Sequence, residues 1–162
     1  METNRRICSL LKENAKLTPT DIARLLGITE ADAEAAVRRL EQKGIIRGYS
    51  AVINEERLGS DYVSAFIEVK VTPKADDGFD EVARTIMMYD EVESLALMSG
   101  AFDLAVTVSG TDYKDIALFV AKRLSTINGV ISTSTHFFLK PYKEKNFFLE
   151  EEQKDERGFF AP

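Results

Sequence analysis

The stretch "LTPTDIARLLGITEADAEAAVRRLEQKG", residues 17 to 44, contains two helical patterns separated by a very short turn. Thr18 can cap the first helix, Pro19 suits its first position, and Asp21 stands where the acid of a capping box reaches back. Gly27 can adopt the left-handed conformation that ends this helix, and Thr29 can cap the next one only two residues later. Helices joined so tightly must cross at a large angle, which predicts a helix-turn-helix.

The flanking residues extend this motif on both sides. Residues 4 to 14 place apolar side chains at helical spacing, which predicts a preceding helix. After Gly44, the stretch "GIIRGYSAVI" has two β-favouring segments around Arg47 and Gly48, the outline of a wing. We therefore expect a winged helix-turn-helix over residues 1–53.

The second helix of the motif can be phased at 100° per residue. Ala33, Val37 and Leu40 share one face, with Ala36 at its margin, so this face should pack on the other two helices. The outward face then consists of Ala31, Ala35, Arg38 and Gln42.

Three acids, Glu30, Asp32 and Glu34, lie on the flanks near the start of this helix. They complement the positive end of the helix dipole, and Asp32 occupies a capping-box position. Glu34 can pair with Arg38, four residues on. The acids thus have a helix-stabilising reason to be present, although they weaken attraction to DNA phosphates.

The charge is unevenly distributed. The whole chain has a formal charge of −6, but residues 1–50 hold nine basic and seven acidic residues, giving +2, and the remainder gives −8. The first segment is the only mildly basic part, and a symmetric oligomer would present it more than once. A three-helix module that serves only as a scaffold or dimerisation element remains the alternative to DNA binding.

The rest of the chain predicts a second domain over residues 62–143, after a polar, turn-rich linker at 54–61. Its elements follow the order β-α-β-β-α-β, the ferredoxin-like arrangement with one antiparallel sheet and both helices on one face. The expected elements are strand 62–72, helix 77–92, strands 93–100 and 102–110, helix 111–127 and strand 129–140. The fold class is therefore α+β, and the uncovered face of the sheet predicts at least a homodimer.

The charged tail, residues 144–162, has two open interpretations. Its composition is typical of disorder. Alternatively, the pairs Phe147–Phe148 and Phe159–Phe160 could anchor it on its own sheet or on a neighbour's.

The order of these motifs carries a resemblance. A helix-turn-helix ending in "VRRLEQKGIIRGYSAVIN", a short linker to "LG", and a β-α-β-β-α-β domain with "GAFD" after its second strand are similar to the Lrp/AsnC (feast/famine) family of transcriptional regulators. The resemblance covers the chain to about residue 143. It implies a dimer built through the C-terminal domains, often assembled into rings, that binds double-stranded DNA with paired winged domains under the control of an amino acid or related metabolite.

The resemblance also bears on the DNA contacts. Arg38 and Arg39 match the basic pair before "LE", and Arg47 matches an arginine of the wing. Family members usually have a polar or basic outward face on this helix, whereas Ala31 and Ala35 stand here, so DNA shape has to carry more of the specificity. The residues expected at DNA are Thr29, Arg38, Arg39, Gln42, Lys43 and Arg47.

A second candidate site is the turn "GAFD", residues Gly100, Ala101, Phe102 and Asp103. The family resemblance implies an effector near this turn, at a subunit interface. The Asp103 carboxylate would suit a ligand ammonium, and free N–H groups at the helix start by Thr111 and Asp112 would suit a ligand carboxylate. An ordinary hairpin turn with an aspartate cap is the alternative.

Residues for catalysis are scarce. The chain has one histidine, His136, and one cysteine, Cys8, and no P-loop or dinucleotide fingerprint. We therefore expect no enzyme activity, cofactor or metal, and we expect a cytoplasmic protein without a membrane segment. Two alternatives stay open: a ligand-sensing oligomer that does not bind DNA, and an enzyme similar to the siroheme decarboxylases, which share the two-domain layout.

Overall fold

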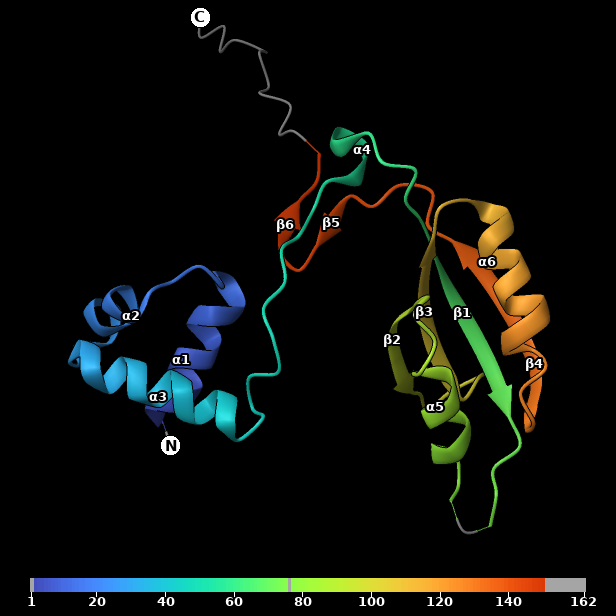
Figure 1. Ribbon diagram of the computed structural model, residues 1–162, viewed down its shortest axis with the longest axis horizontal. Helices are drawn as coiled ribbons and strands as arrows, with labels where there is room; N and C mark the ends of the chain where they lie inside the picture. Colours follow the sequence, from blue (N-terminus) through green and yellow to red (C-terminus); the bar gives the residue numbers. More distant parts are fainter. Residues whose placement is uncertain (1, 76, 151–162) are drawn as a thin grey trace, which may run out of the picture. The chain divides into compact units, whose positions relative to one another are not determined.

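The computed structural model describes residues 2–75 and 77–150, which form two compact units (Figure 1). The first unit contains the chain up to Ile53 together with the segment that follows from Lys143, and the second runs from Asn54 to Tyr142. None of the helices in the described ranges has the length and apolar character needed to cross a membrane.

The first unit is built on three helices, α1 (Glu2–Glu13), α2 (Pro19–Leu26) and α3 (Glu30–Gln42). The expected caps are present: the Thr18 hydroxyl accepts from the Asp21 N–H at 3.2 Å, and Gly27 has φ of +67°. The core of the unit consists of Ile7, Ile22, Ala23, Ala33, Ala36 and Leu40. The helix-turn-helix prediction is confirmed.

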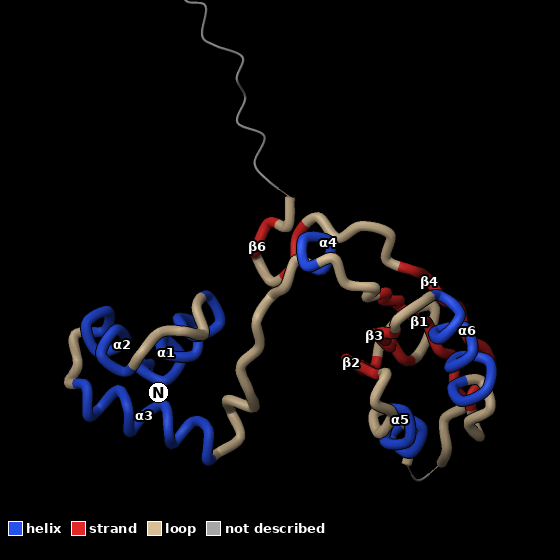
Figure 2. The backbone as a smooth tube through the Cα atoms, turned by 45° about the horizontal axis from the view of Figure 1, so that its top comes forward, coloured by secondary structure: helices blue, strands red, loops and turns tan. Residues whose placement is uncertain are grey.

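The segment after α3 does not form the expected wing hairpin. Among the described residues, no strand lies between α3 and α4 (Glu55–Leu58), and the connection is loop throughout (Figure 2). The β-favouring side chains of Ile45, Tyr49 and Ile53 are about half exposed. β propensity depends on the packing of side chains against neighbours, and these side chains lack such packing among the described residues.

The second unit has the predicted β-α-β-β-α-β order. Its strands are β1 (Val63–Val71), β2 (Val92–Leu97), β3 (Leu104–Gly110) and β4 (Val130–Phe137), and its helices are α5 (Asp80–Ile86) and α6 (Tyr113–Phe119). The sheet order is β2-β3-β1-β4 and the pairings are antiparallel. The fold class is therefore confirmed as α+β.

Alternation along β1 separates the two faces of this sheet. Ala65, Ile67, Val69 and Val71 are buried against α5 and α6, which lie on one face (Figure 1). The side chain of Phe66 lies on the other face, where its ring meets Phe102 edge-on at 5.8 Å between centroids. No helix of the described residues covers that second face. The uncovered face is the feature from which a dimer is expected.

Four of the described elements were not anticipated, and one of them is the short helix α4 within the expected linker 54–61. The helix α6 continues as a π-helical turn, η1 (Val120–Leu124). Strands β5 (Lys143–Glu144) and β6 (Phe147–Phe148) form a small hairpin in the first unit, where the Lys145 ammonium donates to the Ser50 hydroxyl at 3.1 Å. The pair Phe159–Phe160 of the tail lies outside the described residues.

Candidate DNA interface and effector region

The outward face of α3 is as the phasing predicts. Ala31, Ala35, Arg38 and Gln42 are all exposed, while Ala33 and Leu40 on the opposite side are buried. The face thus combines two methyl groups with one cation and one amide. Arg38 and Gln42, one turn apart, are its two side chains able to hydrogen-bond to base edges in a DNA groove.

The pairing of Arg38 with Glu34 is confirmed. The Arg38 guanidinium donates to Glu34 Oε1 at 2.6 Å, and both side chains are more than half exposed. Ion pairs of this kind contribute about 0.3–0.5 kcal/mol, so a DNA phosphate or base can displace the glutamate at low cost. Glu34 nevertheless places a negative charge on the side of the helix that faces outward.

Two of the acids at the helix starts, Asp21 and Asp32, take part in the threonine caps. The Thr29 hydroxyl accepts from the Asp32 N–H at 3.1 Å and donates to the Asp32 carboxylate at 2.7 Å. Hydrogen bonds from the hydroxyl and the N–H of Thr18 lower the pKa of Asp21. The Thr29 hydroxyl is therefore occupied by capping, and its expected contact with DNA remains a prediction.

The other basic residues expected at DNA lie at and beyond the end of α3. Arg39, Lys43 and Arg47 are exposed, and none of them forms an ion pair with the described residues. Close by, the Tyr49 hydroxyl donates to Glu41 at 2.9 Å, and burial together with this hydrogen bond raises the tyrosine pKa. Exposed cations in this position are suited to phosphate contacts.

The turn at Gly100 has an unusual backbone and an open surface. Gly100 has φ of +152°, and an added Cβ would meet no heavy atom within 4 Å. The Asp103 carboxylate accepts the Val71 N–H at 2.8 Å through Oδ2, and the Asp103 N–H donates to the Val69 carbonyl at 3.1 Å. Asp103 thus ties the turn to the neighbouring strand β1. Val71 and Asp103 are 32 residues apart, so no local sequence pattern indicates this contact.

The second half of the expected effector site lies elsewhere. Asp103 precedes β3 and Thr111 follows it, so the seven residues of this extended strand separate them by about 25 Å. One chain therefore cannot bring both groups to a single amino acid. The helix start is also already capped, because Asp112 accepts the Asp115 N–H at 2.7 Å and Thr111 donates to the Asp115 carboxylate at 2.5 Å.

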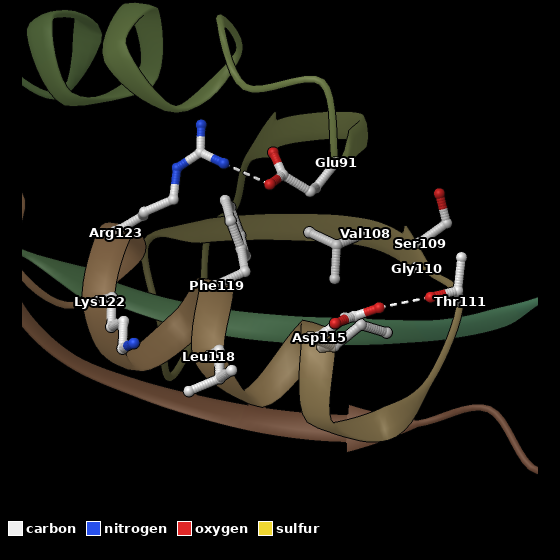
Figure 3. Close-up of a pocket in the computed structure, with 11 residues that line it drawn as sticks. Glu91, Val108, Ser109, Gly110, Thr111, Asp115, Leu118, Phe119, Lys122 and Arg123 are labelled. Atoms are coloured by element: carbon white, nitrogen blue, oxygen red, sulfur yellow. Dashed lines mark hydrogen bonds and ion pairs between the residues drawn. The ribbon is translucent and has the colours of Figure 1, made fainter.

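A groove on the helix side of the sheet was missed by the sequence analysis (Figure 3). Its lining includes Glu91 and Arg123, which form an ion pair across 32 residues. No local spacing signals such a pair. Within the described residues, no group of three or more His, Cys, Asp or Glu side chains could hold a metal ion.

Comparisons with known proteins agree with this architecture. A family model described as winged helix-turn-helix DNA-binding matches residues 2–47, and one described as the Lrp/AsnC ligand binding domain matches residues 64–147. The HTH-type transcriptional regulator YugG of Bacillus subtilis is 41% identical over 99% of this chain and 98% of its own length.

Two further relatives carry more specific names. The leucine-responsive regulatory protein of Haemophilus influenzae is 26% identical over 89% of this chain and 86% of its own. A regulator from Neisseria meningitidis, solved as a complex with L-Met, is 26% identical with a TM-score of 0.70, over 89% of this chain and 92% of its own. The chain belongs to the Lrp/AsnC family of transcriptional regulators, with a helix-turn-helix DNA-binding domain followed by an Lrp-type ligand-binding domain.

Proposed function

We propose that the protein is a sequence-specific DNA-binding regulator whose assembly or DNA affinity responds to an amino acid. The observation that carries the DNA part is the outward face of α3, where Arg38 and Gln42 are exposed. Beside them lie Arg39, Lys43 and Arg47, three exposed cations without an ion pair among the described residues. The family model that matches the second domain is described as a ligand binding domain. One relative is named for its response to leucine and another was solved as a complex with L-Met, which supports an amino acid as the effector.

The active form is proposed to be a homodimer or a larger, ring-like assembly. The open face of the β1–β4 sheet, with Phe66 and Phe102 on it, supports this arrangement. The effector is proposed to bind at the Gly100–Asp103 turn. Oδ2 of Asp103 is engaged by Val71, so the remaining oxygen of the carboxylate is the candidate partner of a ligand ammonium.

The test of DNA binding compares two arginines. Arg38→Ala should weaken binding to the cognate site by about 1–3 kcal/mol and relax its sequence preference, because a base contact is lost. Arg47→Ala should weaken binding to all sequences alike and reduce the salt dependence, because a phosphate contact is lost. Fluorescence anisotropy on the DNA upstream of the protein's own gene, with and without each of the twenty amino acids, measures both.

Arg84→Gln is the control, because this arginine lies on α5 in the second unit and its side chain is exposed to a similar extent as that of Arg38. Unchanged affinity in both Arg38→Ala and Arg47→Ala would remove α3 from the interface. Absence of DNA binding by the parent protein would instead favour a ligand sensor that does not bind DNA. The acids on the flank of α3 and the alanines on its outward face are the observations that favour this second function.

Removal of the acid beside Arg38 should have the opposite effect. Glu34→Gln releases the guanidinium from its 2.6 Å ion pair and deletes a charge that phosphates repel. We expect binding to DNA to tighten by about three- to tenfold at low salt and by less at high salt, since screening weakens the repulsion. Glu81→Gln, which removes a similar exposed ion pair with Lys74 in the second unit, should have no effect. A weaker complex after Glu34→Gln would mean that the pair orients Arg38 for recognition.

A further inference from the structure

A groove with a volume of about 420 Å³ lies on the first unit, between α1 and the segment that follows α3. Arg5, Cys8 and Lys12 line it at intervals of three and four residues, so they form one strip along α1. Ile45 lines it from the segment after α3, where its N–H donates to the Leu40 carbonyl at 2.9 Å. The Ile45 side chain is 58% exposed, so the groove presents apolar surface that is open to a partner.

The rim of this groove is basic. Arg5 and Lys12 are both exposed, and neither forms an ion pair with the described residues. They are seven residues apart on α1, which places them about 10 Å apart along the helix axis. The groove therefore suits a chain segment that carries large apolar side chains together with acids.

The part of the chain beyond the described residues has this composition. Residues 151–162 read "EEQKDERGFFAP", with four acids, two bases and the pair Phe159–Phe160. Glu152 and Asp155 are three residues apart, which is a span of about 10 Å in an extended chain and matches the spacing of the two cations. One segment thus offers both the acids and the apolar side chains that the groove lacks.

The described structure tethers this segment to the same unit. The hairpin β5–β6 belongs to the first unit, where the Lys145 ammonium donates to the Ser50 hydroxyl at 3.1 Å. Ser50 is five residues from Ile45, which is at most about 18 Å of chain. Phe159 is fourteen residues beyond Lys145, a length that spans up to about 50 Å. The tether therefore reaches the groove, and it keeps the segment at a local concentration in about the millimolar range.

We propose that residues 151–162 dock in this groove of their own chain. The pair Phe159–Phe160 covers Ile45 and the Cys8 thiol, and the acids of the segment lie against the two cations of the rim. The four acids and two bases give the segment a net charge of −2, which offsets the +2 of residues 1–50 and weakens their attraction to phosphates. The docking goes beyond the proposed function, and only its effect on DNA binding rests on that function.

Cys8, the single cysteine of the chain, reports the docking directly. The rate at which its thiol reacts with 4,4′-dithiodipyridine is measured on the full chain without DNA, for the parent and for Phe159→Ser/Phe160→Ser. We expect the variant to react about fivefold faster or more, because a tethered segment covers the thiol most of the time. Met87→Ser/Met88→Ser, which changes two adjacent exposed side chains of the second unit, should react like the parent.

The contribution of the acids is tested from both sides. Glu152→Gln/Asp155→Asn leaves the groove intact and should also speed the reaction. Arg5→Gln/Lys12→Gln alters the surroundings of the thiol directly, so its rate is divided into the rate of the same variant without the aromatic pair. We expect this ratio to fall from about fivefold toward one, and to fall likewise for the parent in about 0.5 M salt, because screening weakens the ion pairs.

Circular dichroism reports whether each variant is folded, and Glu152→Gln/Asp155→Asn carries the test if the aromatic variant is not. Equal thiol reaction rates in the parent and in the variants of the segment overturn the docking. A ratio that neither Arg5→Gln/Lys12→Gln nor salt changes overturns the role of the acids.

Fluorescence anisotropy on DNA of unrelated sequence tests the effect on DNA binding. Phe159→Ser/Phe160→Ser should bind about two- to fivefold more tightly than the parent at low salt, because the acids no longer offset the charge of the DNA-binding unit. An unchanged DNA affinity together with a faster thiol reaction overturns this inhibitory effect. Absence of DNA binding by a parent whose Cys8 is protected is a failure of the proposed function, and the docking stands.

Discussion

Phe66→Glu should convert the protein from a dimer or larger assembly into a monomer. Phe66 lies on the uncovered face of the sheet, where its ring contacts Phe102 at 5.8 Å and His136 at 6.1 Å between centroids. A glutamate there would bury an unpaired charge at a sheet-to-sheet interface, which costs about 3–5 kcal/mol, more than about a hundredfold in the dissociation constant. Sedimentation or light scattering at micromolar concentration measures the change.

Met88→Glu is the matched control. Met88 is 76% exposed and follows α5, away from the open face, so the same substitution there should leave the assembly unchanged. If Phe66→Glu retains its mass while remaining folded, the dimer does not use this face of the sheet. A parent protein that is already monomeric at micromolar concentration would contradict the proposed assembly itself.

Asp103→Asn should abolish the stabilisation that an amino acid gives through the Gly100 turn. The amide oxygen can still accept the Val71 N–H, so without ligand the melting temperature and DNA affinity should stay nearly unchanged. The ammonium of the effector, however, loses its counter-charge. For the parent, a ligand at a hundred times its dissociation constant contributes about 2.7 kcal/mol, and this contribution should collapse in the variant.

Thermal unfolding with the amino acid found by the anisotropy screen provides the measurement. Asp77→Asn, an exposed carboxylate 3.8 Å from Arg84, is the control for loss of charge. Retention of the full ligand-induced shift would make Asp103 a structural residue whose role is the Val71 hydrogen bond. Unfolding without ligand would support that structural role still more strongly.

The local features were predictable because their causes lie within a few residues. The caps at Thr18 and Thr29, the left-handed Gly27 and the pair Glu34–Arg38 each depend on neighbours three or four positions away. The alternation over Val63–Val71 likewise fixed which face of β1 is buried. Order and periodicity were enough to give the fold class and the outward face of α3.

The wing shows where local propensity fails. Ile45 and Tyr49 favour strands, but a strand forms only if pairing buries side chains, and both residues remain about half exposed. The tail shows the opposite outcome, because strands form in a segment whose composition is typical of disorder. Its hairpin at Lys143–Phe148 lies in the first unit, where Lys145 reaches Ser50, a contact across 95 residues that composition cannot reveal.

The order of the main elements, the caps and the charges available to a site follow from the sequence alone. Which charges meet depends on the tertiary structure, which separates Asp103 from Thr111 by the length of β3, ties Asp103 to Val71 and joins Glu91 to Arg123. The reason is that helix and strand periodicities report the burial of each residue's own side chain, whereas the distance between two polar groups depends on strand register and helix packing far along the chain.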